Sequence, residues 1–451
     1  MSVTTAAPAR IGLRRSMRLL HAAALVVGII IGASIFVQPS EITREVPSIA
    51  GILGVWLVAG LLTLAGALIC AELASAFPQT GGVYVFLRET FSPAVGFLWG
   101  WAMFWSMHSG IIAAVAVIFA RYAAYFVPMG AVGIKAVAVG AILVVSAVNY
   151  VGVQHGSRLQ TAFTVGKVVA IALLIAAGFA LGADLPQHFA VSADAGAAGV
   201  VGAGGAGTTP AGFLRAIGAG LFAFGGWHMV TYAAGETVEP ERTIPRALVL
   251  GMAVVIACYI ALNTVYLYVL PLEVVATSTR VAADAADAVL GAGGGATLSA
   301  LVVFSTAGAL GGLILAGPRV YWSMAEDRLL FRWAGAVHPR FRTPHRAIAL
   351  QAVWASVLVA TGSYRALFTR VVYTEWIFFA LMAAGLFVLR RRTGYAPAYR
   401  VRAHPVLPAL FILVALAVVL NQVASQPVNA VIGLAIVAAG LPVYAVWRRQ
   451  G

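Results

Sequence analysis

Runs of about 20 apolar residues, separated by short charged segments, dominate this sequence. Of its 451 residues, 61% are hydrophobic and only 10% are charged, whereas soluble domains contain roughly 25% charged residues. A helix of about 20 apolar residues is long enough to cross a bilayer. We therefore expect an all-α polytopic membrane protein. Its twelve spans are expected near residues 19–45, 48–77, 93–126, 131–150, 158–182, 211–235, 246–270, 298–323, 345–361, 366–389, 405–424 and 429–447.

The order of these runs predicts the organisation of the chain. Five spans precede an Ala/Gly-rich segment without basic residues, five follow it, and two remain. A segment of this composition is expected to be a flexible connection. The expected parts are an N-terminal tail at 1–18, a first five-helix unit at 19–182, an external loop at 183–210, a second five-helix unit at 211–389, and helices 11 and 12 with the C-terminus at 390–451.

Basic residues give the expected orientation. The net charge is +14, but the arginines cluster between apolar runs instead of forming one basic face, so nucleic acid is an improbable partner. With the N-terminus inside, 21 of the 29 Lys and Arg residues fall in cytoplasmic segments. This asymmetry predicts a multi-pass protein of the inner (cytoplasmic) membrane with both termini in the cytoplasm. The apolar run after Arg18 is longer than that of a signal peptide, so we interpret it as an uncleaved first helix.

Two spans contain small residues at their centres. The first span carries Gly32-Ala33-Ser34-Ile35 and the sixth carries Gly225-Gly226. A glycine costs a helix about 1 kcal/mol relative to alanine, and a broken helix is tolerated at membrane depth only where the freed backbone groups bind something or line a cavity. Close helix packing is the alternative for one such segment. Because each segment begins a set of five spans, the pair predicts an inverted repeat with a binding site at the midplane.

Several motifs occur in a fixed order along nearly the whole chain. Together they resemble the amino acid–polyamine–organocation (APC) transporters, in particular the L-type amino acid transporter branch and its bacterial relatives. The motifs are Ile31-Gly32-Ala33-Ser34-Ile35-Phe36, Glu72-Leu73-Ala74-Ser75, Pro78 to Tyr84, Leu221 to Trp227, Pro240 to Arg246, Pro318 to Tyr321 and Met324 to Asp327.

This resemblance implies a LeuT-type fold with an inverted 5+5 repeat and broken helices 1 and 6. It also implies transport of amino acids by alternating access. The chain departs from the family pattern at Ser34, where a glycine is usual, and at Glu326 and Arg328, which replace a basic residue and a glycine. The loop between spans 3 and 4 lacks the cysteine that animal L-type transporters use for a disulfide-linked heavy chain, so no such partner is expected.

Broken helices suit a zwitterionic substrate, because they offer N–H groups at a new N-terminus and carbonyls at a new C-terminus. We expect the backbone at Ala33, Ser34 and Ile35 to bind the carboxylate, with Gly32 at the break. The carbonyls near Ile30–Ile31 and Phe222–Phe224 would accept from the ammonium, beside Gly225 and Gly226. Phe222 matches the family's aromatic gate; the alternative is a phenylalanine in the core or facing lipid.

Lys167 is the most informative charged residue. It follows Arg158 by nine residues, which is about 13 Å along a helix. A charge at this depth costs about 2.5–3.5 kcal/mol on insertion scales. In the resembled family a lysine of span 5 takes the place of a sodium ion and contacts broken span 1, which would favour proton-linked transport or exchange. The alternative is that Lys167 snorkels to the cytoplasmic interface.

Three further residues could line the cavity. Glu375 begins the apolar part of span 10 and would either bind a cationic group or pair with a histidine, or else be solvated near the outer interface. His108 and His228 could titrate near neutral pH, although a hydrogen-bonded core histidine is the commoner case. Glu72 and the groups Arg242–Arg246 and Arg319–Asp327 are expected to form ion pairs of an inner gate.

These observations predict a permease for neutral amino acids that works by exchange or is linked to protons. A cationic amino acid or polyamine carrier is the alternative, with Glu375 as the side-chain partner. A membrane-embedded enzyme is less consistent, because no nucleophile–base pair or metal spacing is present at membrane depth. A channel is also less consistent, because a channel would more often be a symmetric oligomer of fewer spans. Partners are limited to an amino acid, the lipid bilayer and protons, with no cofactor and no metal. Cys70 and Cys258 lie in apolar runs and are expected to be unpaired thiols.

Overall fold

The structure, a computed structural model, describes residues 13–32, 34–182, 209–278, 280–291 and 293–450. Within these ranges the chain is helical and forms no β-strand beyond one isolated bridge between Met17 and Thr237. Ten helical runs among the described residues are long and apolar enough to cross a membrane. The protein is therefore an all-α, multi-pass membrane protein.

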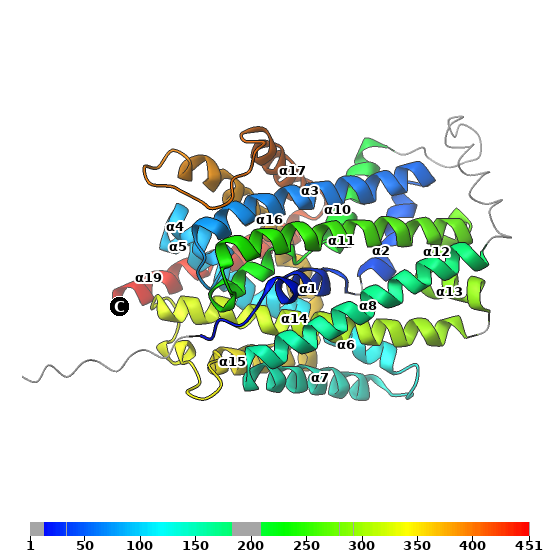
Figure 1. The fold of residues 1–451 in the computed structure, drawn as a ribbon, viewed down its shortest axis with the longest axis horizontal. Helices are drawn as coiled ribbons and strands as arrows, with labels where there is room; N and C mark the ends of the chain where they lie inside the picture. The colour runs from blue at the N-terminus through cyan, green and yellow to red at the C-terminus, as the bar shows by residue number, and fades with distance from the viewer. Residues whose placement is uncertain (1–12, 33, 183–208, 279, 292, 451) are drawn as a thin grey trace, which may run out of the picture.

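The described elements before residue 183 include both short and long helices (Figure 1). They are α1 (Leu19–Ile30), α2 (Ser34–Glu45), α3 (Ile49–Ala76), α4 (Val83–Thr90), α5 (Pro93–Ala102), a π-helical turn η1 (Met103–Met107), α6 (His108–Ala123), α7 (Ala131–Val151) and α8 (Val153–Leu181).

The described elements after residue 208 also include both short and long helices. They are α10 (Pro210–Ala223), a 3₁₀ segment η2 (Trp227–Glu236), α11 (Pro240–Val269), α12 (Leu272–Thr277), α13 (Val281–Leu290), α14 (Gly294–Glu326), a 3₁₀ turn η3 (Arg332–Gly335), α15 (His345–Thr361), α16 (Tyr364–Leu389), α17 (Val406–Ser425), α18 (Pro427–Ala438) and α19 (Gly440–Gln450).

Both segments with central small residues are interrupted, as the sequence predicts. The helix α1 ends at Ile30 and α2 begins at Ser34. The helix α10 ends at Ala223, and the chain resumes as η2 after Gly226, whose φ is +97°. An L-residue with a side chain is strained in this left-handed region, so Gly226 makes the second break possible.

Several predicted boundaries were wrong. The helices α8, α11 and α14 begin at Val153, Pro240 and Gly294, ahead of the predicted starts at 158, 246 and 298. Each added stretch contains polar residues. They lower the hydropathy from which the starts were predicted, but they do not prevent the helix from forming. The predicted last span is divided between α18 and α19. Most of the predicted external loop, residues 183–208, lies outside the described residues.

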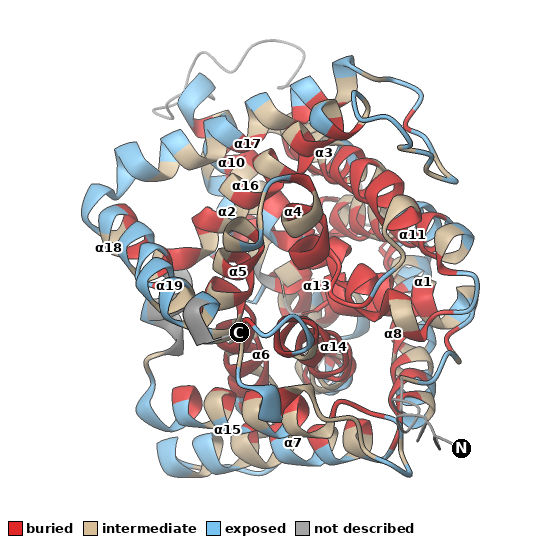
Figure 2. Cartoon of the chain, turned by 90° about the vertical axis from the view of Figure 1, so that its left-hand side faces the viewer, coloured by how far each residue is buried: buried red, intermediate tan, exposed pale blue. Residues whose placement is uncertain are grey.

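Burial falls from the centre of the bundle to its periphery. Figure 2 shows mostly buried residues in α14, α3 and α6, and a smaller share of buried residues in α7, α15 and α18. The exposed residues of the outer helices include large aliphatic side chains such as Val132 and Leu420. An apolar exterior of this kind is what lipid contact requires.

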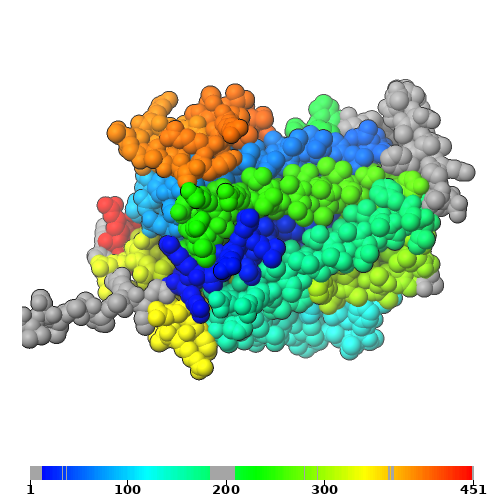
Figure 3. All heavy atoms as spheres, viewed as in Figure 1, coloured from blue at the N-terminus to red at the C-terminus, as the bar shows by residue number. Residues whose placement is uncertain are grey.

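The short helix α1 lies at the centre of the arrangement. It packs against α8, α11 and α14, and the space-filling view shows α8 and α11 on either side of it (Figure 3). The helices α10 and α2 pack together. The start of the described chain and α19 lie at the same end of the bundle (Figure 1).

Candidate functional site

The two helix breaks contact each other. A Cβ atom on Gly226 would lie only 2.5 Å from Cγ2 of Ile29, the residue before the end of α1. The hydroxyl of Tyr259, on α11, lies 2.9 Å from the carbonyl oxygen of Ile30 and 3.1 Å from that of Ala223. One hydroxyl can donate to only one of these oxygens at a time, so Tyr259 bridges the last carbonyls of the two interrupted helices.

Lys167 lies against the first break. It is 0% exposed, and its Nζ atom donates to the carbonyl oxygens of Gly28 at 3.0 Å, Ile31 at 2.7 Å and Ser305 at 2.9 Å. These three bonds use the three donors of an ammonium group. The predicted contact of Lys167 with broken span 1 is therefore present, and snorkelling to an interface is excluded.

Because α8 begins at Val153 and has 29 residues, Lys167 lies at its midpoint. The carbonyls of the first break also face α14, since the Ser305 hydroxyl lies 3.1 Å from Ile31 O and 3.4 Å from Gly32 O and can donate to one of them at a time. The carbonyls of Gly28, Ile30 and Ile31 thus accept hydrogen bonds from residues of three other helices.

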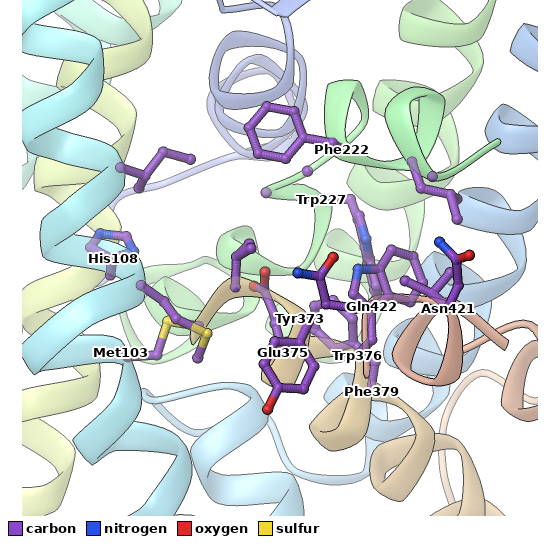
Figure 4. Close-up of a pocket in the computed structure, with 18 of the residues that line it drawn as sticks. Met103, His108, Phe222, Trp227, Tyr373, Glu375, Trp376, Phe379, Asn421 and Gln422 are labelled. Atoms are coloured by element: carbon purple, nitrogen blue, oxygen red, sulfur yellow. The ribbon is translucent and has the colours of Figure 1, made fainter. Parts of the chain in front are cut away.

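A cavity of about 370 Å³ lies beside the second break (Figure 4). This volume falls in the range of sites for small molecules. Gly225 and Gly226 with residues of α10 and η2 form one wall, and η1, α6, α16 and α17 form the others. Its aromatic lining includes Phe222, Trp227, Trp376 and Phe379. Arg215, Ser425 and Gln426, which are exposed, place the opening at the end of the bundle away from α19.

Glu375 lines this cavity, and its side chain is 18% exposed. Its Oε1 atom lies 3.6 Å from Nε2 of His228, which is beyond hydrogen-bond distance. His228 is buried behind the cavity wall among the rings of Trp99, Trp227 and Phe379. Glu375 therefore faces both a histidine and the cavity. This position agrees with the alternative in which Glu375 lines the cavity and not with the one in which it is solvated near the outer interface.

His108 also lines the cavity, directly after the π-helical turn. It is 1% exposed, and its Nε2 atom lies 2.9 Å from the carbonyl oxygen of Leu313 on α14. A π-turn inserts one extra residue into a helix and is frequent at functional sites. The turn brings Met103 and Met107 to the same cavity wall as His108.

The structure brings together only part of the predicted substrate site. His108, Phe222, Gly225, Gly226 and Glu375 line the cavity. The predicted site residues Ile30, Ile31, Gly32, Ser34, Ile35 and Phe224 are not among its lining residues, and Ala33 lies outside the described residues.

Phe222 and Phe224 have different environments. Phe222 is 41% exposed at the cavity, whereas Phe224 is buried against Trp56 and Tyr259 with ring centroids 6.2 Å and 4.8 Å away. Phe224 therefore supports the second break from behind, and only Phe222 can touch a solute in this cavity.

The end of the bundle that carries α19 is closed by ion pairs. Arg319 and Glu236 are both 0% exposed and paired at 2.6 Å. Arg390 pairs with Glu72 at 2.5 Å. The backbone of Ser16 and Met17 hydrogen-bonds to Glu236 and Val238 across this end. Of the expected charges, Glu72 and Arg319 form ion pairs at this end, whereas no ion pair of Arg242 or Arg246 occurs among the described residues. A role of these pairs as a gate stays a prediction.

A second group of charges ties α4 to the end of α14. Arg88 forms a close ion pair with Asp327, and the hydroxyl of Tyr84 donates to the same carboxylate at 2.6 Å. Burial and the negative charge of Asp327 raise the pKa of Tyr84. The phenol therefore stays protonated and remains a donor to Asp327.

Sequence reasoning missed Tyr259, Ser305 and the amides Asn421 and Gln422, which line the cavity from α17. A hydroxyl in the middle of an apolar span is a signal, because a buried tyrosine needs an acceptor. The amides were missed because spans 11 and 12 were assigned to a position outside the repeat.

These features define a class of protein: a multi-pass membrane protein with a solute-sized cavity between interrupted helices. A family model described as "Amino acid permease" matches residues 17–445. The serine/threonine exchanger SteT of Bacillus subtilis is 32% identical over 437 residues, covering 96% of this chain and 97% of that protein.

Two human proteins are more distant relatives. The b(0,+)-type amino acid transporter 1 is 28% identical, covering 94% of this chain and 86% of its own. The cystine/glutamate transporter is 27% identical, covering 96% and 85%. The chain belongs to the amino acid permease family. The family and these relatives are transporters, not enzymes.

Proposed function

We propose that this protein exchanges neutral amino acids across the cytoplasmic membrane by alternating access. The observation that carries the proposal is a solute-sized cavity bounded by Gly225 and Gly226 at the second break. This break contacts the first one, where Lys167 binds the carbonyl oxygens. A relative that is named a serine/threonine exchanger over nearly the full length of both chains supports exchange as the mode of transport.

The fold that we propose is the LeuT type, with twelve transmembrane segments. Beyond the ten long apolar runs, α1 with α2 would form one segment and the 17-residue helix α15 another. Helices at matching positions of the two five-helix units pack together: α3 with α11, α6 with α14, and α7 with α15. Such pairing is expected when two repeats are related by a pseudo-two-fold axis.

We place the end that carries α19 in the cytoplasm. The distribution of lysine and arginine favours this orientation, because 21 of 29 fall in segments on that side. The cavity would then open to the outside while the Arg319–Glu236 and Arg390–Glu72 pairs close the inside. This arrangement corresponds to the outward-facing state of an alternating-access cycle.

We assign the substrate groups to the two breaks as follows. The first N–H groups of α2, at Ser34 and Ile35, have no acceptor within the helix. They remain the proposed carboxylate donors, although neither residue lines the cavity in this structure. The ammonium would bind at Gly225 and Gly226, because the Ile30 and Ile31 carbonyls already accept from Tyr259 and from Lys167 and Ser305. Phe222 would close over the bound substrate.

Lys167 would act as the coupling residue in place of a sodium ion. Its ammonium occupies the position at which a cation neutralises the C-terminal dipole of α1. A change in its protonation would alter the stability of the break, and this links substrate binding to a proton. Because Lys167 would take the place of a sodium ion, we predict that the carrier does not need sodium.

A cationic amino acid or a polyamine is the second candidate, favoured by the carboxylate of Glu375 in the cavity. Glu375→Gln keeps the shape of the side chain and removes its charge. For a cationic substrate this variant should lower uptake at subsaturating concentration by at least tenfold, since charged hydrogen bonds contribute about 1.5–3 kcal/mol. Uptake of neutral amino acids should fall much less. Unchanged cationic uptake would reject the second candidate.

A thermal-shift screen of the purified protein against amino acids and polyamines tests the substrate class. A ligand at 100 times its dissociation constant adds about 2.7 kcal/mol to stability. We expect neutral amino acids to raise the melting temperature and D-enantiomers to have little effect. Stabilisation by polyamines alone would replace the first proposal with the second.

A further inference from the structure

A second cavity, of about 350 Å³, lies at the end of the bundle that carries α19. Residues 327–329 at the end of α14, the start of α5 and the last turns of α19 line it, and Figure 2 shows α5 and α19 side by side at this end. Its charged lining residues are Arg88, Arg328, Arg448 and Asp327, which gives a net charge of +2. A pocket with this excess of guanidinium groups favours an anionic ligand.

The aromatic residues beside the pocket indicate its depth in the membrane. Tyr444 and Trp447 line it, and Trp447 packs between Phe97 and Phe331 with ring centroids at 6.2 Å and 5.2 Å. Trp447 and Arg448 end the apolar run of α18 and α19. Tryptophan, tyrosine and arginine at the end of a span lie at the level of the lipid headgroups.

The surface next to the pocket is apolar and exposed. Phe331 is 59% exposed, and Leu441 and Val446 on α19 are also exposed. A ligand bound by the arginines would thus extend an apolar part along α19 towards the hydrocarbon. Phosphate oxygens match the fork of donors on arginine, and a basic pocket at the headgroup level is suited to an acidic lipid.

We propose that this pocket binds the phosphate of an anionic phospholipid whose acyl chains lie along α19. The net positive charge favours a headgroup without its own cation, so phosphatidylglycerol should bind in preference to phosphatidylcholine. The pocket also contacts the tie between α4 and α14, because Arg88 and Tyr84 both hold Asp327. The lipid phosphate and Asp327 would then both bind Arg88. Lipid binding would in this way affect the contact between α4 and the end of α14 at the closed end of the bundle.

Native mass spectrometry of the full-length protein in detergent tests this proposal. Phosphatidylglycerol and phosphatidylcholine with identical acyl chains are added in equal amounts, and the retained ratio is measured. The double variant Arg328→Gln/Arg448→Gln should lower the preference for phosphatidylglycerol by about fivefold for each arginine. Arg340→Gln/Arg342→Gln is the matched control, because it removes two exposed arginines and, like the test pair, includes one with a positive φ.

The single variant Arg448→Gln keeps the test valid if the double variant does not fold. Arg448 is exposed near the C-terminus, and its loss should lower the preference about fivefold. An unchanged lipid ratio in a folded variant, or an equal fall in the control pair, would overturn the proposal.

Two further arms separate the possible sources of phosphate. Phosphatidylglycerol with brominated acyl chains should quench part of the tryptophan fluorescence of the wild-type protein. This quenching should be absent in Trp447→Phe, and brominated phosphatidylcholine should not cause it. Inorganic phosphate at the same concentration should not displace the lipid. Displacement by inorganic phosphate, or Trp447-dependent quenching of equal size by both lipids, would contradict an anionic lipid site. These readouts measure lipid binding, so their failure leaves the transport proposal unaffected.

Discussion

Lys167 satisfies three carbonyl oxygens from two helices at once, and no other group at the first break has this role among the described residues. Replacement by alanine would leave these buried oxygens with fewer donors, at a cost of about 1–3 kcal/mol for each group left unsatisfied. We predict that Lys167→Ala lowers the melting temperature and abolishes transport or its pH dependence.

The check is uptake into proteoliposomes at several pH values, together with a melting curve. Lys135→Ala is the matched control, because the Nζ atom of Lys135 also donates to one carbonyl, that of Ala360, but is exposed. The control should retain wild-type uptake. Uptake by Lys167→Ala with unchanged pH dependence would reject the coupling role.

At the scale of elements, the break after α10 depends on one glycine. Gly226→Ala places a Cβ in the left-handed region, at about 1–2 kcal/mol, and 2.5 Å from Ile29 Cγ2. We predict a lower melting temperature and a lower maximal transport rate. Gly140→Ala in α7 is the control, since its Cβ would meet no atom within 4 Å; it should keep activity and gain up to about 1 kcal/mol.

Both breaks could be predicted from sequence, because glycines at the centre of an apolar run leave a local signal. The partners of the breaks could not be predicted in the same way. Tyr259 lies 229 residues from Ile30 and Ser305 lies 274 residues from Ile31, so their contacts depend on tertiary packing. The cavity lies on the side of the second break, so Phe222 and Glu375 line it, whereas Ile30, Ile31, Gly32, Ser34 and Ile35 do not. That Phe222 and Glu375 contact the substrate stays a prediction.

At the scale of the whole molecule, one end is open at the cavity and the other is closed around the buried pair of Arg319 and Glu236. Removing one partner of a buried pair leaves an uncompensated charge and costs about 3–5 kcal/mol. We predict that Arg319→Gln is strongly destabilised, and that Arg319→Gln/Glu236→Gln regains at least half of the loss. Melting curves of the single and double variants measure this coupling. Equal stability of the two would contradict it.

Amino acid counterflow in proteoliposomes tests the proposed exchange of neutral amino acids most directly. Vesicles are loaded with an unlabelled neutral amino acid and placed in a low concentration of the labelled one, without sodium. Exchange by alternating access predicts saturable uptake that internal amino acid accelerates and that Gly226→Ala impairs. Uptake that rises linearly with concentration and does not respond to internal amino acid would contradict it.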